Sequence, residues 1–200
     1  MVKSAGLHLR TSRQRCAVFM KGFLMKCFGL LELNVEYAGV RFAIGLRNSN
    51  DKSMRIGLVA GYRVIVCENK MLTGDFNPLS AKHSKNFNLI DAVSVAVDRI
   101  QRNIGRVEQE IERKKITLFT NDEARSLIYR AFLNERFPVS LLRTVHQEYF
   151  LKSSYEDFSG NNLWNLENAF TTSFKKLKPV QQFEAAAKLG KFLSPEIMPF

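Results

Sequence analysis

Residues 30–47, LLELNVEYAGVRFAIGLR, carry the strongest signal for the fold. Apolar and polar residues alternate from residue 31 to residue 37, and the alternation resumes from residue 40 to residue 47. Ala38 and Gly39 separate the two runs, and a two-residue loop with glycine in second place is typical of a β-hairpin. We therefore expect two antiparallel strands in which Tyr37 lies opposite Val40.

This hairpin has a specific register, because a slip of one residue would move every apolar side chain to the other face. We expect Glu36 opposite Arg41 on the polar face. On the apolar face we expect the pairs Val35 with Phe42, Leu33 with Ile44, and Leu31 with Leu46.

A polar stretch, about residues 48–55, follows the hairpin and consists largely of residues that favour turns. Residues 62–67, YRVIVC, predict a third strand, so the stretch connects strands two and three in the simplest interpretation. Long loops at the end of a rigid sheet are also frequent functional positions. Both interpretations, connector alone and connector with a ligand contact, remain open.

A strict heptad seam follows, which predicts a long helix. Its positions carry no leucine and its flanks carry no complementary charges, so we favour packing against the sheet or later helices over self-association. The outer side bears a line of arginines that could follow phosphates. The alternative is a solvated face, since Glu110 and Lys114 are spaced as an i,i+4 ion pair. The seam residues are Ile90, Val93, Val97, Ile100, Ile104, Val107 and Ile111, and the outer arginines are Arg99, Arg102, Arg106 and Arg113.

The remaining sequence predicts helices. Thr120 and Glu123 have the spacing of a capping box, which begins a helix to about Leu133. Pro138 suits the first turn of the next helix, to about Leu151. Two further helices are expected from the apolar positions Leu163, Leu166, Phe170, Phe174 and Leu177, and from Phe183, Ala186, Ala187 and Gly190.

These elements define an α+β protein with three parts. Residues 23–88 form an antiparallel sheet, and residues 89–200 form a mainly helical part that packs on it as one domain. Residues 1–22 form a basic segment without sustained periodicity, which we expect to be disordered or non-native. A transit peptide or the remnant of a longer chain are alternatives for this segment.

The composition limits the classes of function. The formal net charge is +11, but the first 31 residues contain six basic and no acidic residues, so the rest is only moderately basic. No apolar run reaches the ~18 residues of a membrane span, and we expect no membrane association. The three scattered cysteines fit a reducing compartment, and we expect a cytoplasmic protein. No metal-ligand spacing, phosphate-binding glycine loop or nucleophile motif is present, so we expect no metal and no cofactor, and an enzyme assignment has no positive support.

Several stretches carry a resemblance to a known family: GLRNSNDKS, GYRVIVCEN, KHSKNFNLIDAV, VDRIQRN, IYRAF, LWNLENAFTTSFK and AAKLG. The chain resembles a phage- and plasmid-associated family with a domain of unknown function, over about residues 28–193. The resemblance implies association with mobile DNA and no established activity. The positions that match the family pattern are Asn48, Ser49, Asp51, Ser53, Cys67 and Asn69.

Two hypotheses for function follow. The first is a non-enzymatic protein that binds single-stranded or duplex DNA through a basic surface. The second is an enzyme acting on nucleic acid or a nucleotide, with its site near residues 48–53. The candidate nucleic-acid-binding residues are Arg47, Lys52, Arg55, Arg63, Lys82, Lys85, Arg99, Arg102 and Arg106.

Overall fold

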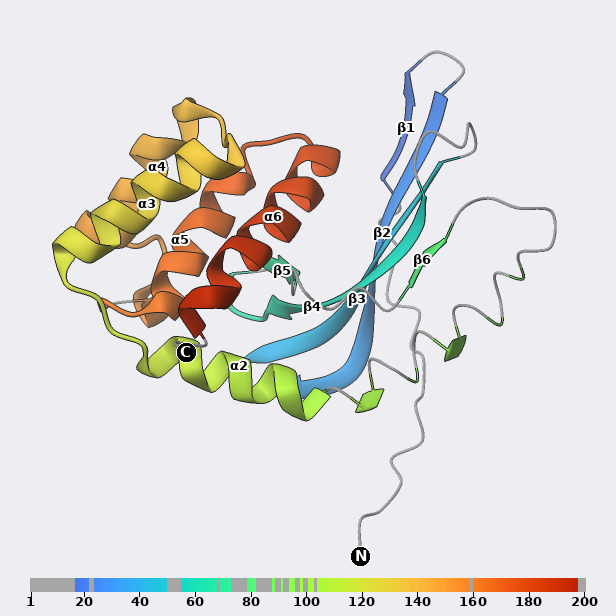
Figure 1. Ribbon diagram of the computed structural model, residues 1–200, viewed down its shortest axis with the longest axis horizontal. Helices are drawn as coiled ribbons and strands as arrows, with labels where there is room; N and C mark the ends of the chain where they lie inside the picture. The colour runs from blue at the N-terminus through green and yellow to red at the C-terminus, as the bar shows by residue number, and fades with distance from the viewer. Residues whose placement is uncertain are drawn as a thin grey trace, which may run out of the picture.

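A six-stranded antiparallel sheet is followed by helices that cover one of its faces (Figure 1). This arrangement, seen in a computed structural model, confirms the expected α+β class. The structure describes residues 17–21, 24–49, 55–67, 69–72, 79–81, 104–158 and 160–197, together with residues 88, 91, 94, 95, 98, 101 and 102.

The sheet is a meander of long strands with two short strands at its edge. The long strands lie in chain order and are β1 (Ala17–Lys21), β2 (Leu24–Tyr37), β3 (Val40–Ser49) and β4 (Ile56–Val64). The two short strands are β5 (Lys70–Leu72) and β6 (Leu79–Ala81), and both pair with β4. β1 lies inside the basic segment expected to be unpacked, and residues 1–16 lie outside the described part of the chain.

The predicted hairpin is present, and its turn has the expected geometry. Ala38 and Gly39 both have positive φ values, 47° and 85°, as a tight two-residue hairpin turn requires. The pairs Tyr37–Val40 and Glu36–Arg41 are confirmed, and the Arg41 guanidinium bonds the Glu36 carboxylate.

The register predicted beyond this point was wrong. An irregularity between Glu32 and Glu36 inserts two extra residues into β2, so that Ile44 pairs with Leu31 rather than with Leu33. The predicted pairs of Val35 with Phe42 and Leu31 with Leu46 fail for the same reason. A bulge of this kind bends a strand and increases its twist, and Figure 1 shows the sheet curving toward the helices at this end.

The third strand was also placed too late in the sequence. β4 ends at Val64, and residues 65–67 form a turn that brings the chain back to β5. The backbone N–H of Val64 donates to the carbonyl of Asn69 across this turn, at 2.9 Å. The connection from β3 to β4 is correspondingly shorter than predicted, because Asn48 and Ser49 belong to β3.

Helices α2–α6 follow the sheet and confirm the predicted helical half. The capping box of α3 is present, with the Thr120 hydroxyl and the Glu123 carboxylate bonding each other's backbone N–H groups. The segment that begins after Pro138 is irregular, with a 3-10 turn (Val139–Leu141), α4 and a π-helical turn (Gln147–Leu151). The helix bounds are α2 (Ile104–Ile116), α3 (Asn121–Glu135), α4 (Leu142–His146), α5 (Leu163–Phe174) and α6 (Pro179–Ile197).

The interior contains two apolar clusters. The first joins β2, β3 and β4 to Val107 and Ile111 of α2 and to Trp164 of α5. The second lies among α3, α4, α5 and α6. Because α5 contributes to both clusters and is buried along nearly its whole length, it is the central helix of the protein.

The heptad seam packs within the chain, as favoured from the sequence, wherever its side chains are described. Ile111 is completely buried against the sheet, and Val107 is 7% exposed in the same cluster. The seam positions before Ile104 lie outside the described residues. Within the described ranges, no helix has the length and apolar character needed to cross a membrane.

Candidate functional site

Three polar side chains meet in the interior between the sheet and the helices. Tyr62 projects from β4, Lys114 from α2 and Glu167 from α5, and each is at most 2% exposed. The Lys114 ammonium lies 2.9 Å from Glu167 Oε2 and donates to Tyr62 Oη at 3.1 Å. Glu110, one helical turn before Lys114 and partly exposed, accepts a further bond from the same ammonium at 2.8 Å. We call Tyr62, Lys114 and Glu167 the buried triad.

Burial and mutual contact set the protonation states of the buried triad. Burial by itself lowers the pKa of Lys114, but Glu167, Tyr62 and Glu110 outweigh it and hold that pKa well above its ordinary value. Burial raises the pKa of Glu167, and the Lys114 ammonium opposes that rise. Burial also keeps the pKa of Tyr62 well above 10.0. We conclude that Lys114 is a cation in the folded protein and that Tyr62 is a neutral phenol.

A second polar cluster joins the turn after β4 to α5, the helix that also carries Glu167. The side-chain amide of Asn69 donates to Asn168 Oδ1 at 2.9 Å and to Thr172 Oγ1 at 3.1 Å. The Cys67 thiol lies 3.8 Å from Asn168 Oδ1, and the Lys175 ammonium bonds the Cys67 carbonyl. Burial raises the pKa of the Cys67 thiol, which makes it a poor nucleophile.

The central residues of both clusters are shielded from solvent, which prevents direct contact with a ligand. The triad, Cys67, Asn69 and Asn168 are each at most 3% exposed. They can hold the sheet against α5, but they cannot bind a substrate without an opening in the packing. Among the residues that the structure describes, no three His, Cys, Asp or Glu side chains gather as metal ligands do.

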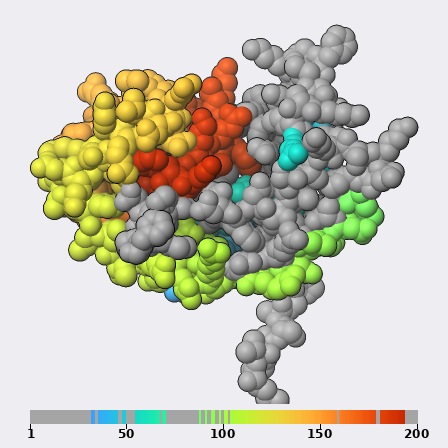
Figure 2. All heavy atoms as spheres, in the orientation of Figure 1, coloured from blue at the N-terminus to red at the C-terminus, as the bar shows by residue number. Residues whose placement is uncertain are grey.

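The outer line of arginines predicted from the sequence is exposed where the structure describes it. Arg106 and Arg113 of α2 are exposed, as is Arg102 just before the helix, and helical spacing places Arg106 and Arg113 away from the buried Val107, Ile111 and Lys114. Figure 2 shows α2, in yellow-green, along one edge of the molecule.

The family model for a domain of unknown function (DUF932) matches residues 19–191. The chain belongs to this family. Comparison with curated proteins and with solved structures gives no match. The family match covers every strand and helix that contributes to the two polar clusters.

The fold of this DUF932 protein joins two of the stretches on which the family resemblance was based. GYRVIVCEN supplies Tyr62, Cys67 and Asn69, and LWNLENAFTTSFK supplies Glu167 and Asn168. The two stretches are about 100 residues apart in the sequence, and Tyr62 also stacks on Trp164 with ring centroids 6.0 Å apart. Their common role in the DUF932 fold is therefore to fasten the central helix to the sheet.

The predicted DNA-contacting residues that the structure describes differ in their exposure. Arg55, Arg102 and Arg106 are exposed, whereas Arg63 is largely buried and forms an ion pair with Glu32 at 2.8 Å. Arg47 pairs through its backbone with Phe28 and Gly57, and its side chain is not described. Of the family-pattern residues, Asn48 accepts a bond from the Ser49 backbone, and Ser49 is 1% exposed. Residues Asp51, Lys52, Ser53, Lys82, Lys85 and Arg99 lie outside the described residues.

Sequence reasoning missed the two charged members of the buried triad. Lys114 was interpreted as half of a solvated i,i+4 pair, and the Glu110 contact is indeed present. The seam spacing contained the missing signal, because the step from Ile111 to Lys114 continues the three-and-four pattern of Ile104, Val107 and Ile111. Its side chain therefore points into the protein, where it needs a buried carboxylate.

Proposed function

We propose that this DUF932 protein is a non-enzymatic nucleic-acid-binding protein of mobile DNA, and that α2 contacts the phosphate backbone. The observation that carries the proposal is the exposed line of Arg102, Arg106 and Arg113. Arg106 and Arg113 alone span roughly 10 Å of α2 at about 1.5 Å per residue, and Arg102 precedes the helix. A duplex carries one negative charge per ≈ 1.7 Å of its axis, so a line of this length meets several phosphates.

The charges around this line support its availability. Glu110 is bound to Lys114 and Glu112 to Lys115, so two nearby carboxylates are already engaged with lysines. Arg102 donates a hydrogen bond to the backbone carbonyl of Asp98 at 3.3 Å. Because a carbonyl is neutral, this bond does not neutralise the charge of the guanidinium. Arg106 and Arg113 form no ion pair within the described part of the chain.

The closed interior favours binding over catalysis. Tyr62 and Lys114, whose pKa values lie well above their ordinary values, belong to the buried triad, which a substrate cannot reach in this conformation. The alternative, an enzyme acting on nucleic acid or a nucleotide near residues 48–53, gains no support from the described residues. We also propose a cytoplasmic location, which the buried free thiol of Cys67 supports because such thiols persist in reducing compartments.

The proposal is tested by salt titration of DNA binding. The variant Arg102→Gln/Arg106→Gln/Arg113→Gln removes the line and retains polar side chains at exposed sites. A charge-matched control, Lys152→Gln/Lys188→Gln/Lys191→Gln, removes three exposed cations from other elements. Affinity for labelled single-stranded and duplex DNA is measured by fluorescence anisotropy over a range of salt concentrations.

We expect the arginine variant to lower the slope of log affinity against log salt by roughly 0.7–0.9 for each phosphate that the protein no longer neutralises. The control should retain the slope of the wild-type protein. Equal slopes for the wild type and the arginine variant would contradict the proposal, as would an equal decrease in the control. The substrate whose affinity decreases more identifies single strands or duplex as the preferred partner.

A further inference from the structure

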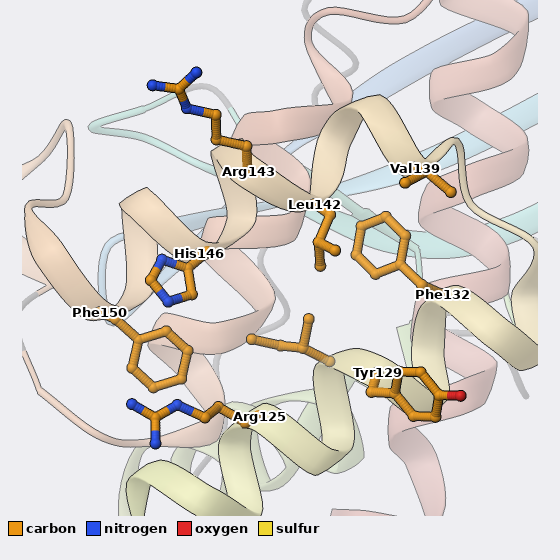
Figure 3. A pocket seen from close by; sticks show the side chains of 9 residues that line it. Arg125, Tyr129, Phe132, Val139, Leu142, Arg143, His146 and Phe150 are labelled. Carbon is orange, nitrogen blue, oxygen red and sulfur yellow. The ribbon is translucent and has the colours of Figure 1, made fainter.

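A groove lies between α3 and the segment formed by α4 and the π-helical turn, on the helical half of the molecule (Figure 3). Its volume is about 520 Å³, within the range of pockets that bind ligands. Ile128 and Phe132 of α3 line it from one helix, and Leu142 and Phe150 line it from the opposite segment. The proposed DNA contacts lie on α2, so this groove is independent of them.

Apolar surface continues outside the groove, which indicates a macromolecular partner rather than a small molecule. Tyr129 is 67% exposed and Val139 is 76% exposed at its border. Leu133, one turn after Tyr129 on α3, is 62% exposed. Large apolar side chains gathered on one face of a protein mark interaction surfaces more often than isolated ones do.

The charged residues that line the groove are basic. They are Arg125 and Arg143, with His146 beside them, and no acidic residue lines the groove in the described part of the chain. Arg125 stacks over Phe150 with its guanidinium carbon 5.4 Å from the ring centroid, so one charge is held at the apolar surface. The same Arg125 pairs with Asp122 at 2.9 Å, but both side chains are exposed, so an incoming carboxylate can compete for the guanidinium.

The charges also disfavour a second copy of this chain as the occupant. A two-fold symmetric contact brings the same patch of both copies together. Arg125 and Arg143 of both copies would then share one interface that receives no acidic residue from the groove lining, and like charges in an interface oppose association. The complementary partner carries apolar and acidic side chains together.

We propose that this groove binds an amphipathic helix of another protein, with apolar residues toward Leu142 and Phe150 and acidic residues toward Arg125 and Arg143. A helix that presents apolar residues at i, i+3, i+4 and i+7 fills grooves of this kind. Flanking carboxylates meet the two guanidinium groups. The acidic flank supplies the specificity, and the apolar face supplies most of the affinity.

The probe is a fluorescein-labelled synthetic peptide of about 18 residues, long enough to form a helix, with leucines on one face and glutamates beside them. One comparison peptide has lysine in place of each glutamate, and another has the same composition in scrambled order. Binding to the full-length protein is measured by anisotropy. Val139→Ser/Leu142→Ser reduces the apolar surface, Arg125→Gln/Arg143→Gln removes the basic edge, and Ile116→Ser/Leu118→Ser is an exposed apolar control elsewhere.

We expect the acidic peptide to bind the wild type and the Ile116/Leu118 control equally. The Val139/Leu142 variant should bind about tenfold more weakly, and the arginine variant should lose both affinity and salt dependence. Absence of binding at about 1 mM peptide, equal binding of the lysine peptide, or an equal decrease in the control would overturn the proposal. A decrease of DNA affinity in the Val139/Leu142 variant would instead assign the groove to nucleic acid, and conversion of a wild-type dimer to a monomer would assign it to a second copy.

Discussion

Removing the lysine of the buried triad should destabilise the protein far more than removing its glutamate. In Lys114→Met, the Glu167 carboxylate remains buried at 2% exposure. Within the triad, only the Tyr62 hydroxyl still donates a hydrogen bond to it. An uncompensated charge of this kind costs about 3–5 kcal/mol. Glu167→Gln leaves the Lys114 ammonium bound to Glu110 at 2.8 Å, so the expected loss of stability is only about 1–3 kcal/mol.

The pH dependence of Lys114→Met provides a second signature. Without the ammonium, burial and the nearby Glu110 carboxylate raise the folded pKa of Glu167 further above its ordinary value of 4.5, and only the Tyr62 hydroxyl opposes the rise. A carboxyl whose pKa is higher in the folded state binds its proton more tightly there, so the variant gains stability relative to wild type as pH falls from the folded pKa toward 4.5. Wild type should show a smaller gain, because Lys114 opposes the rise in the Glu167 pKa without cancelling it.

Urea unfolding at several pH values measures both effects. As a control, Tyr62→Phe/Lys114→Met/Glu167→Leu replaces the whole triad by apolar groups and should be more stable than Lys114→Met alone, since no buried charge remains. A loss of stability below about 1 kcal/mol for Lys114→Met, no recovery on acidification, or a triple variant less stable than the single one would refute the reasoning.

Two further predictions concern packing. Ile111→Ala should lower the free energy of unfolding by about 2–5 kcal/mol in urea titrations, because Ile111 is fully buried against the sheet; a change of oligomeric state in light scattering without loss of stability would support a coiled coil instead. Tyr149→Phe should leave stability unchanged or raise it by about 1 kcal/mol, because burial raises the pKa of Tyr149 to about 12 and its hydroxyl has no hydrogen-bond partner among the described residues. A clear loss of stability would show that this hydroxyl has a partner.

The sequence predicts those parts of the fold that depend on local rules. The turn at Ala38 and Gly39 and the capping box of α3 follow from neighbouring residues, and both are present. The register of β2 before Glu36 depends on a bulge. Because the bulge inserts two residues, it leaves the alternation of apolar and polar residues unchanged and gives no signal in the sequence. β5 and β6 have three residues each, too few for a periodic signal, and only the edge of β4 defines them.

The polar clusters were less predictable because they depend on contacts distant in sequence. Glu167, Asn168 and Thr171 on α5 have the composition of an exposed helix face, yet all three are buried. Glu167 depends on partners on β4 and α2, and Asn168 depends on Cys67 and Asn69 after β4. No local rule brings those partners together. The basic line on α2 could be identified early because it requires only helical spacing.

The contacts that fasten α5 to the sheet also determine when the protein can fold during synthesis. Asn69 bonds Asn168 and Tyr62 bonds Glu167, so these contacts close over 99 and 105 residues of chain. The ribosome therefore makes the whole sheet and α2–α4 before the central helix exists. Until α5 emerges, the apolar face of the sheet has no central helix to cover it, and contacts of long sequence separation form slowly. During that interval the nascent sheet is exposed to aggregation, and a chaperone that shields it would affect the yield of folded protein more than its final stability.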